Sequence, residues 1–228
     1  MKKLIVAIDG PSGVGKSTLS KKLATELDYV NIDTGAMYRC VALAVKRAGI
    51  RLDDRPALRQ LIDDLKIKFN QTDSGNTVFL NNENVSEAIR RPEVSQLTPL
   101  VAALPDVRQS MVARQREMGV EGGVVLEGRD IGTVVFPQAE VKFFMVASAD
   151  ERGRRRYEEL IAKGVHVDLE QTIRDIEIRD MADSERELSP LVRAADAVEI
   201  DTNGRGIDEV FAMMLATIQT RLNRPGSS

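Results

Sequence analysis

The chain has 228 residues, 43% of them hydrophobic and 29% charged, which suits one globular domain with a sizeable core. Its 32 Lys and Arg residues are balanced by 35 Asp and Glu residues, so the net charge of −3 argues against a nucleic acid polymer as partner, and any positive site must be local. The single cysteine, Cys40, excludes an internal disulfide.

The N-terminus resembles a signal peptide only briefly. Its apolar run begins at Leu4 and stops at Asp9, which is shorter than the core of roughly 7 apolar residues that a signal peptide needs. Elsewhere, no apolar run approaches the roughly 18 residues of a membrane span. We therefore expect a cytoplasmic protein without a membrane partner.

Short apolar runs predict five β-strands. These runs lack the alternation of a sheet with one wet face, so they indicate strands buried on both sides. They lie at Lys3–Ile8, Tyr29–Ile32, Gly123–Glu127, Val141–Ala147 and Ala197–Asp201. Helical patterns lie between them, for example at Lys16–Leu27 and Ala36–Ala48. This alternation predicts an α/β fold with a parallel sheet.

One region, from Leu52 to about Pro105, breaks this rhythm. Within 65–85, the alternating runs KIKFN and TVFLN flank the turn-rich QTDSGN, which predicts a small hairpin with at least one exposed face. Helical patterns follow near Glu93–Leu104 and Asp106–Met118. We therefore expect an insertion on the α/β core, and a frayed end in the tail NRPGSS.

The stretch DGPSGVGKST matches the phosphate-binding pattern G-x-x-x-x-G-K-[ST], with an apolar strand before it and a helical pattern after it. Small residues let backbone N–H groups converge on phosphates, and the start of a helix favours negative charge. Lys16 is predicted to reach the β- and γ-phosphates of ATP, and the hydroxyl of Ser17 to ligate Mg²⁺. The predicted nucleotide-binding residues are Gly10, Pro11, Ser12, Gly13, Val14, Gly15, Lys16, Ser17 and Thr18. A chance glycine turn before a helix is the alternative.

This loop alone does not identify the reaction. A GTPase switch would need a guanine-reading motif such as N-K-x-D, and the Asn-rich NNEN contains no lysine. A motor or a large ATPase would need a longer chain. We favour a small-molecule kinase, because candidates for the acceptor side are also visible.

Two candidate segments follow predicted strands. Thr34 and Arg39 lie near the start of a predicted helix, and they form either a second anion site or a plain helix start with a surface arginine. Glu127, Arg129 and Asp130 lie at the end of a buried strand, where ligands bind in open α/β sheets. The alternative there is a surface turn made by Arg129 and Asp130.

A third segment, ADERGRRRYEEL, clusters arginines after a strand. In a helix, this spacing would put Arg152, Arg155 and Arg156 on one side, where they could close over a triphosphate. The predicted catalytic residues are these three arginines together with Lys16 and Arg129. The alternative is a solvated helix face whose arginines are balanced by neighbouring glutamates.

The fourth segment is IEIRDMADSERELSP. Its spacing predicts that one helical face contains two positive residues, Arg179 and Arg186, with the negative residue Asp183 between them. The alternative is a surface salt bridge worth a few tenths of a kcal/mol.

Taken together and in order, the motifs DGPSGVGKST, DTGAMYR, LEGRDIGTVVFP and RDMADSERELSPL resemble those of bacterial cytidylate (CMP) kinases over nearly the whole chain. The resemblance implies a single kinase domain of the P-loop NTPase type, with a five-stranded parallel sheet flanked by helices. It implies a core at about 1–51 and 106–222, an enlarged β-containing monophosphate-binding insert at about 52–105, and a short lid at about 152–168.

The same resemblance implies transfer of the γ-phosphate of ATP to CMP, and to dCMP, by a monomer. Another P-loop kinase acting on UMP, dTMP or a non-nucleotide acceptor is the nearest alternative, and a nucleotide-binding switch without transfer chemistry is a more distant one. The implied substrate-binding residues are Arg39, Arg129 and Thr34 for the CMP phosphate, Arg179 and Asp183 for the ribose, and Arg108, Asp130 and Arg186 for cytosine.

Two positions depart from the family pattern. Pro99 stands where a serine contacts the base in relatives, so that contact is lost or moves to Thr98. Glu127 stands where many relatives have aspartate, and it keeps the carboxylate.

Overall fold

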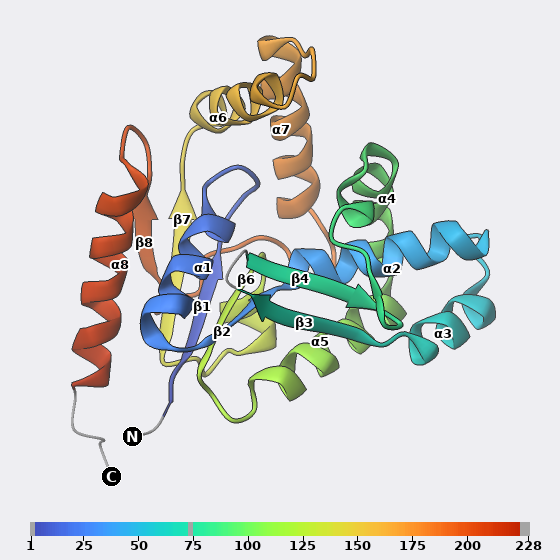
Figure 1. Cartoon of the computed structure of the whole chain (residues 1–228), viewed down its shortest axis with the longest axis horizontal. Helices are drawn as coiled ribbons and strands as arrows, with labels where there is room; N and C mark the ends of the chain where they lie inside the picture. The colour runs from blue at the N-terminus through green and yellow to red at the C-terminus, as the bar shows by residue number, and fades with distance from the viewer. Residues whose placement is uncertain (1–2, 73–74, 224–228) are drawn as a thin grey trace. The chain divides into compact units, whose positions relative to one another are not determined.

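The computed structural model describes residues 3–72 and 75–223 (Figure 1). The strands are β1 (Ile5–Asp9), β2 (Val30–Asp33), β3 (Ile67–Thr72), β4 (Gly75–Leu80), β5 (Glu83–Asn84), β6 (Val124–Gly128), β7 (Val141–Val146) and β8 (Val198–Asp201). The helices are α1 (Lys16–Leu27), α2 (Thr34–Ala48), α3 (Arg55–Asp64), α4 (Pro92–Ala102), α5 (Pro105–Gly119), α6 (Ala149–Ala162), α7 (Leu169–Ser184) and α8 (Ile207–Leu222), with a 3-10 turn η1 (Ala88–Arg90) and a π-helical turn η2 (Ile131–Val135).

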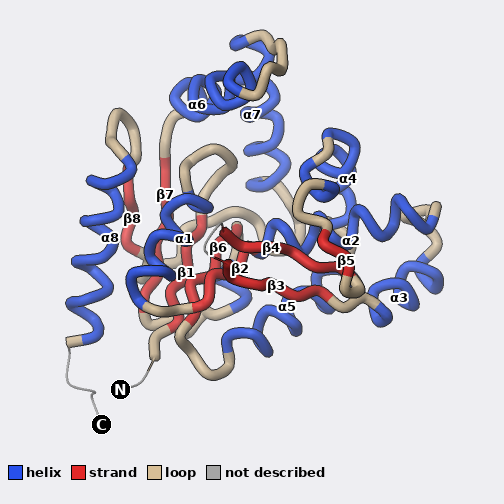
Figure 2. The backbone as a smooth tube through the Cα atoms, viewed as in Figure 1, coloured by secondary structure: helices blue, strands red, loops and turns tan. Residues whose placement is uncertain are grey.

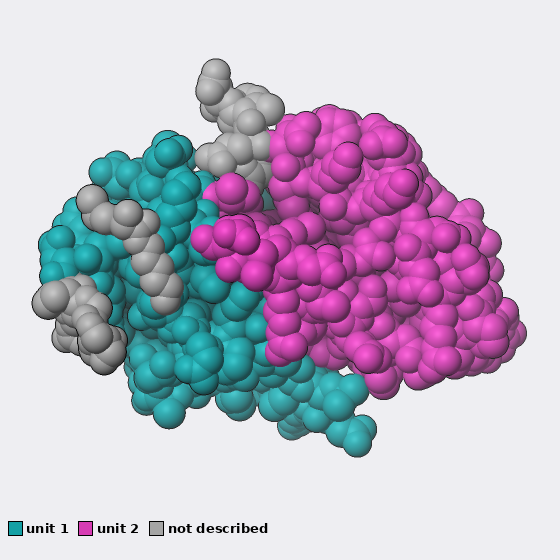
Figure 3. Space-filling model, turned by 90° about the horizontal axis from the view of Figure 1, so that it is seen from below, with its two compact units in different colours: residues 1–29, 122–228 teal, residues 30–121 magenta. Residues whose placement is uncertain are grey.

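The chain divides into two compact units, coloured separately in Figure 3. Unit 1 consists of residues 1–29 and 122–228, and unit 2 consists of residues 30–121. Unit 2 contains the region 52–105 that the sequence predicts as an insertion, together with β2, α2 and α5. Of the predicted frayed tail, residues 224–228 lie outside the described residues.

A five-stranded sheet has the order β2-β6-β1-β7-β8. Strand β1 pairs in parallel with β6 and β7, and β7 pairs in parallel with β8. All five strands predicted from the sequence are confirmed, with no end shifted by more than two residues. The register places Asp9 opposite both Gly128 and Phe144, so the carboxyl ends of three neighbouring strands meet where the phosphate loop begins.

Apolar side chains explain why unit 1 holds together. The strands contribute Val6, Ile8, Phe143 and Met145, which are at most 1% exposed. Helices α1 and α8 pack against each other, α1 also packs against β6 and α8 against β7, and Figure 2 shows both helices beside the strands. Each fully buried side chain of this size contributes about 1.5–3 kcal/mol, which fixes the base from which the phosphate loop projects.

Unit 2 contains the predicted hairpin. Strands β3 and β4 pair antiparallel, with Ile67 opposite Leu80, and the short strand β5 adds to β4. Ile67, Val78 and Leu80 are buried whereas Lys68 is exposed, so the sheet has one covered face as the alternation predicts. Among the described residues, none of the helices combines the length and the apolar character that crossing a bilayer requires.

Candidate active site

The phosphate loop connects β1 to α1 in unit 1. Gly10 has φ 150°, and a Cβ there would lie 2.4 Å from the carbonyl oxygen of Met145, so only glycine fits. Gly15 ends the loop as the N-cap of α1, and no side chain caps that helix. The first N–H groups of α1 are therefore available to a phosphate.

Lys16 is almost fully buried, at 6% exposure. Its Nζ donates a hydrogen bond to the carbonyl oxygen of Pro11 at 2.6 Å, within its own loop. Burial, and then the positive charge of Arg129, lower the pKa of Lys16 from 10.5 to about 7, against the opposing charges of Glu127 and Asp9. A phosphate bound here would offset both causes of the shift, because it supplies negative charge to a desolvated cation.

The side chains of Ser17 and Glu127 lie together, and their oxygen atoms are of the kind that Mg²⁺ prefers as ligands. The Ser17 hydroxyl donates to Glu127 Oε2 at 2.7 Å, and the Ser20 hydroxyl donates to Oε1 at 3.3 Å. Glu127 is 4% exposed, so this carboxylate is held firmly at the end of β6. Within the described residues no group of three or more His, Cys, Asp or Glu side chains is arranged to hold a metal ion. A cation bound beside Ser17 would therefore take its remaining ligands from phosphate and water.

Arg129 and Asp183 form the centre of the acceptor-side charges in unit 1. Arg129 Nε donates to Asp183 Oδ2 at 2.7 Å, and an Arg186 nitrogen lies 3.7 Å from Oδ1. Burial alone would raise the pKa of Asp183, but the charges of Arg129, Arg186 and Arg179 hold it below its ordinary value. The charges of Arg129 and Arg179 also reach Lys16. Arg129 and Arg179, predicted from two separate motifs, therefore lie close enough to Lys16 to affect its charge, and Asp183 and Arg186 join this group through Arg129.

The prediction that Arg186 shares a helical face with Arg179 and Asp183 is wrong. Helix α7 ends at Ser184, where the N–H of Glu185 bonds back to the carbonyl oxygen of Met181. The chain then turns, and the N–H of Leu191 donates to the carbonyl oxygen of Asp183. Arg186 still reaches Asp183, but it does so from this turn.

The arginines of α6 separate into two groups. Arg152 is buried, and it donates to the carbonyl oxygen of Ser12 in the phosphate loop at 3.1 Å and pairs with Asp180 of α7. Arg155 pairs with Glu151 and also donates to the carbonyl oxygen of Thr202. In the same helix Arg156 pairs with Glu159. Of the three arginines predicted as site residues, Arg152 thus touches the phosphate loop, while Arg155 and Arg156 are balanced by glutamates.

In unit 2, the segment DTGAMYR forms the start of α2. The Asp33 side chain accepts a hydrogen bond from the N–H of Ala36 and caps the helix, and Thr34 is buried in its first turn. Arg39 donates to the Ser95 hydroxyl at 2.8 Å and to the carbonyl oxygen of Ile89 at 3.4 Å. Sequence reasoning did not single out Ser95.

The base-contacting candidates of unit 2 lie on α4 and α5. The Thr98 hydroxyl donates to the carbonyl oxygen of Val94 at 2.6 Å, one turn back in its own helix. Arg108 is 5% exposed, donates to the carbonyl oxygen of Ala102 at 3.2 Å and lies over the ring of Tyr38. Tyr38 is a second residue that sequence reasoning missed, although it stands inside the motif DTGAMYR.

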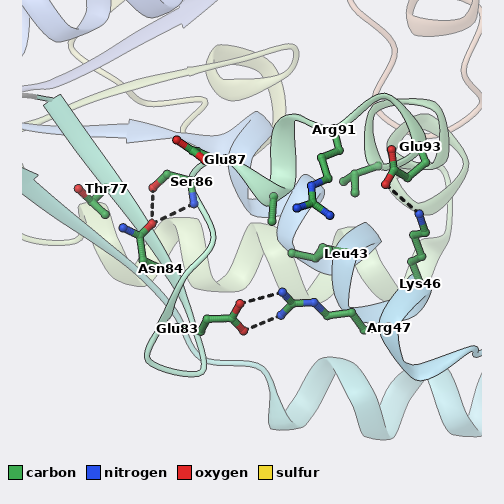
Figure 4. Close-up of a pocket in the computed structure, with 12 residues that line it drawn as sticks. Leu43, Lys46, Arg47, Thr77, Glu83, Asn84, Ser86, Glu87, Arg91 and Glu93 are labelled. Carbon is green, nitrogen blue, oxygen red and sulfur yellow. Dashed lines mark hydrogen bonds and ion pairs between the residues drawn. The ribbon is translucent and has the colours of Figure 1, made fainter.

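Unit 2 also contains a cavity of about 700 Å³ (Figure 4). Two ion pairs lie in its wall, Arg47–Glu83 at 2.7 Å and Lys46–Glu93 at 3.1 Å. None of the predicted site residues is among its described lining residues. The cavity is therefore not part of the acceptor site predicted from the sequence.

Asp9 and Asp130 are two buried carboxylates in unit 1, at 4% and 5% exposure. Asp9 accepts hydrogen bonds from the backbone N–H groups of Ile131 and Gly132. Burial raises the pKa of Asp9 to about 6, and the nearby charge of Asp130 adds to this rise. Asp9 was missed because the phosphate-binding pattern begins one residue later.

Comparison with known proteins identifies the family of this chain. The profile of the cytidylate kinase family matches residues 6–220. The cytidylate kinase of Syntrophotalea carbinolica is 61% identical over 220 residues, which is 96% of this chain and 94% of that protein. The cytidylate kinase of Geobacter sulfurreducens is 54% identical over 218 residues, again 96% of this chain and 94% of that protein.

Among solved structures, an uncharacterized protein from Eubacterium ventriosum has a TM-score of 0.52 at 14% identity, and the match covers 96% of this chain and 99% of that one. This likeness supports the α/β fold. The family match and the high identity to named relatives go further: the chain is a phosphotransferase that belongs to the cytidylate kinase family.

Proposed function

We propose that this chain transfers the γ-phosphate of ATP to CMP, giving ADP and CDP, and that it also accepts dCMP. The observation that carries the proposal is the gathering of Arg129, Arg179 and Asp183 beside Lys16 of the phosphate loop. Transfer between two nucleotides brings two anions end to end, so it needs concentrated positive charge and little covalent chemistry from the protein.

On the donor side, Lys16 would bind the β- and γ-phosphates once its ammonium leaves the carbonyl oxygen of Pro11. Mg²⁺ would be held by the Ser17 hydroxyl, with the Glu127 carboxylate orienting that hydroxyl or a bound water. The bound ion would neutralise charge on the β- and γ-phosphate oxygens.

On the acceptor side, Arg39 and Arg129 would bind the CMP phosphate beside Thr34, and this shared role rests on the family resemblance. Arginine suits the task because it grips phosphate bidentately and never deprotonates. No general base is needed, since the second pKa of a phosphate monoester lies near about 6 and the attacking oxygen is already ionised at neutral pH. Arg179 and Asp183 would bind the ribose hydroxyls.

Base choice follows from hydrogen-bond polarity. Cytosine offers a donor at N4 and an acceptor at N3, and uracil reverses both. The Asp130 carboxylate would accept from the N4 amino group, while Arg108 or Arg186 would donate to N3 or O2. Uracil would place O4 against a carboxylate and N3–H against a cation, so the wrong base is repelled rather than merely bound less well.

Water is the competing acceptor, so the site must exclude it. We expect the insert (52–105) and the lid (152–168) to close when both nucleotides bind. Arg155 and Arg156 would then exchange their glutamate partners for phosphate oxygens. The family resemblance also implies a monomer, and we place the protein in the cytoplasm, where ATP and free nucleotides meet.

The test is a coupled assay for ADP formation with ATP, Mg²⁺ and one acceptor at a time: CMP, dCMP, UMP, dTMP and AMP. We expect the highest kcat/KM with CMP. Arg179→Met should lower the rate with CMP strongly, while Arg174→Met, on the same helix but exposed and paired with Glu170, should not. A higher kcat/KM with UMP or dTMP would reject CMP as the acceptor.

A further inference from the structure

Asp9 links the phosphate loop to the segment that carries Arg129 and Asp130. It is the last residue of β1 and directly precedes Gly10, the first glycine of the loop. Its Oδ1 accepts a hydrogen bond from the N–H of Ile131 at 2.8 Å, and its Oδ2 accepts one from the N–H of Gly132 at 2.7 Å. Both carboxylate oxygens are therefore used on one short stretch of backbone.

That stretch is the start of the π-helical turn η2. The N–H groups of Val134 and Val135 both donate to the carbonyl oxygen of Asp130, so the turn begins at this residue. The first N–H groups of any such turn lack a partner inside it, and the Asp130 side chain does not cap them. Asp9, at the end of β1, supplies the missing cap. Single π-helical turns are rare and are frequently found at functional sites.

The backbone that Asp9 binds, at Ile131 and Gly132, has little room to move. A Cβ at Gly132 would lie 3.1 Å from Lys142 Cδ and 3.4 Å from Asp9 Oδ2. Lys142 is itself buried, and its ammonium donates to the carbonyl oxygen of Pro137 at 2.6 Å and to Asp196 at 2.8 Å. The backbone from Asp130 to Pro137 is thus held at one end by Asp9 and at the other by Lys142.

A carboxylate this buried is costly to keep in a folded protein unless its hydrogen bonds offset the loss of water. The two backbone N–H groups provide that offset. Burial still raises the pKa of Asp9 to about 6, and Asp130 adds to the rise while Lys16 opposes it. Asp9 is therefore within electrostatic reach both of Lys16 in the phosphate loop and of Asp130.

We propose that Asp9 is a positioning residue for the acceptor: it keeps Arg129 and Asp130 in a fixed place relative to the phosphate loop, and so sets the preference for cytosine. The inference rests on the proposed function, in that Asp130 is taken to read the base. Asp9 itself would touch neither nucleotide. Its effect reaches the substrate through the backbone of Ile131 and Gly132.

The test uses Asp9→Asn in the full-length protein. The amide has nearly the shape of the carboxylate, but its nitrogen would face one of the two N–H donors and leave it unpaired. We expect the ratio of kcat/KM for CMP to that for UMP to fall about tenfold, with the KM for ATP changed less than about twofold. Asp208→Asn, an exposed carboxylate on α8, is the matched control and should change neither quantity.

Two results would overturn the inference. A rise in the KM for ATP alone would mean that Asp9 acts through its charge on Lys16. A lower thermal stability with unchanged kinetics would mean that it only closes the turn. If Asp9→Asn does not fold, Gly132→Ala crowds the same turn, mainly against Lys142, while leaving the Asp9 charge in place, and it should also lower the CMP to UMP ratio. A wild-type chain that does not prefer CMP would refute the proposed function before Asp9 is tested.

Discussion

The guanidinium carbon of Arg108 lies 5.6 Å from the centroid of the Tyr38 ring, within the range of a cation–π interaction. Both residues are buried, at 5% and 8% exposure, and Arg108 also donates to the carbonyl oxygen of Ala102. An arginine held from two directions loses little freedom when a substrate arrives. Tyr38, the aromatic residue of DTGAMYR, therefore helps to hold Arg108 in place, and Arg108 is the arginine that the family resemblance implies in base recognition.

We predict that Tyr38→Leu lowers kcat/KM for CMP by between about 2-fold and 30-fold, because the cation–π interaction is lost. Tyr38→Phe keeps the ring and should retain most of the activity. Steady-state kinetics with CMP and UMP measure both effects. Equal losses in the two variants would assign the effect to the Tyr38 hydroxyl and would reject the ring as the support of Arg108.

The second prediction concerns Asp130. Asp130→Asn replaces an acceptor with a group that can also donate, so the penalty against uracil O4 should fall. Buried polar groups left without a partner can account for discrimination on the order of 10⁴, and we expect the variant to lose a large part of the preference for CMP over UMP. The measurement is the ratio of the two kcat/KM values. An unchanged ratio would remove Asp130 from base recognition.

The phosphate loop and the five central strands were predictable from the sequence because each depends on neighbouring residues. Continuous apolar runs indicate buried strands, and Gly10 and Lys16 stand at fixed spacing in a loop of known shape. The hairpin was predictable for the same reason, since alternating runs flank a turn-rich stretch. The short strand β5 was not predicted, because two residues carry no periodicity.

Contacts between distant segments were harder to predict. Asp9 and Ile131 are 122 positions apart in sequence, and nothing local marks the first as a partner of the second. The position of Arg186 was mispredicted because its spacing from Asp183 is helical, while the chain leaves the helix at Ser184. Arg186 still lies near Asp183, because opposite charges close in sequence can meet in a turn as well as in a helix.

The third prediction concerns the ion pair between Arg129 and Asp183, whose side chains are 18% and 15% exposed. Asp183→Asn should lower the free energy of unfolding at neutral pH by about 1–3 kcal/mol, because a partly buried arginine loses its charged partner. Urea denaturation measures this. Asp175→Asn, an exposed carboxylate on the same helix, is the control and should have little effect.

The difference in the free energy of unfolding between wild type and Asp183→Asn should depend on pH. Arg129 and its neighbours hold the folded-state pKa of Asp183 below the ordinary 3.8, so its contribution is present above that value and is lost as the pH falls through the lowered pKa. The gap between wild type and Asp183→Asn should therefore shrink in acid. A gap that stays constant down to about pH 3 would mean that the Asp183 charge does not stabilise the fold.

The fourth prediction concerns water as a competing acceptor. If the catalytic arrangement forms only when both nucleotides are bound, ATP with Mg²⁺ alone should give negligible ADP. Adding CMP should raise the rate by orders of magnitude. Fast hydrolysis by the isolated protein would instead indicate an ATPase or a nucleotide-dependent switch. Cytidine, which lacks the phosphate that Arg39 and Arg129 would bind, is the matched control and should not stimulate ADP formation.

The last prediction uses the buried ammonium of Lys16. Its pKa is lowered from 10.5 to about 7 in the folded chain, so between these values the unfolded chain binds more protons, and the free energy of unfolding should rise with pH across that window. Phosphate binding should restore the charge, so ATP binding at about pH 8 should take up most of one proton.

Calorimetry of ATP binding in buffers with different ionisation enthalpies measures this uptake. Lys16→Arg is the matched variant, because an arginine stays charged at every accessible pH and leaves no proton to be taken up. The variant is expected to bind ATP more weakly but without proton uptake. If wild type and Lys16→Arg take up the same number of protons, the proton goes to another group, and Lys16 is already charged before the nucleotide binds.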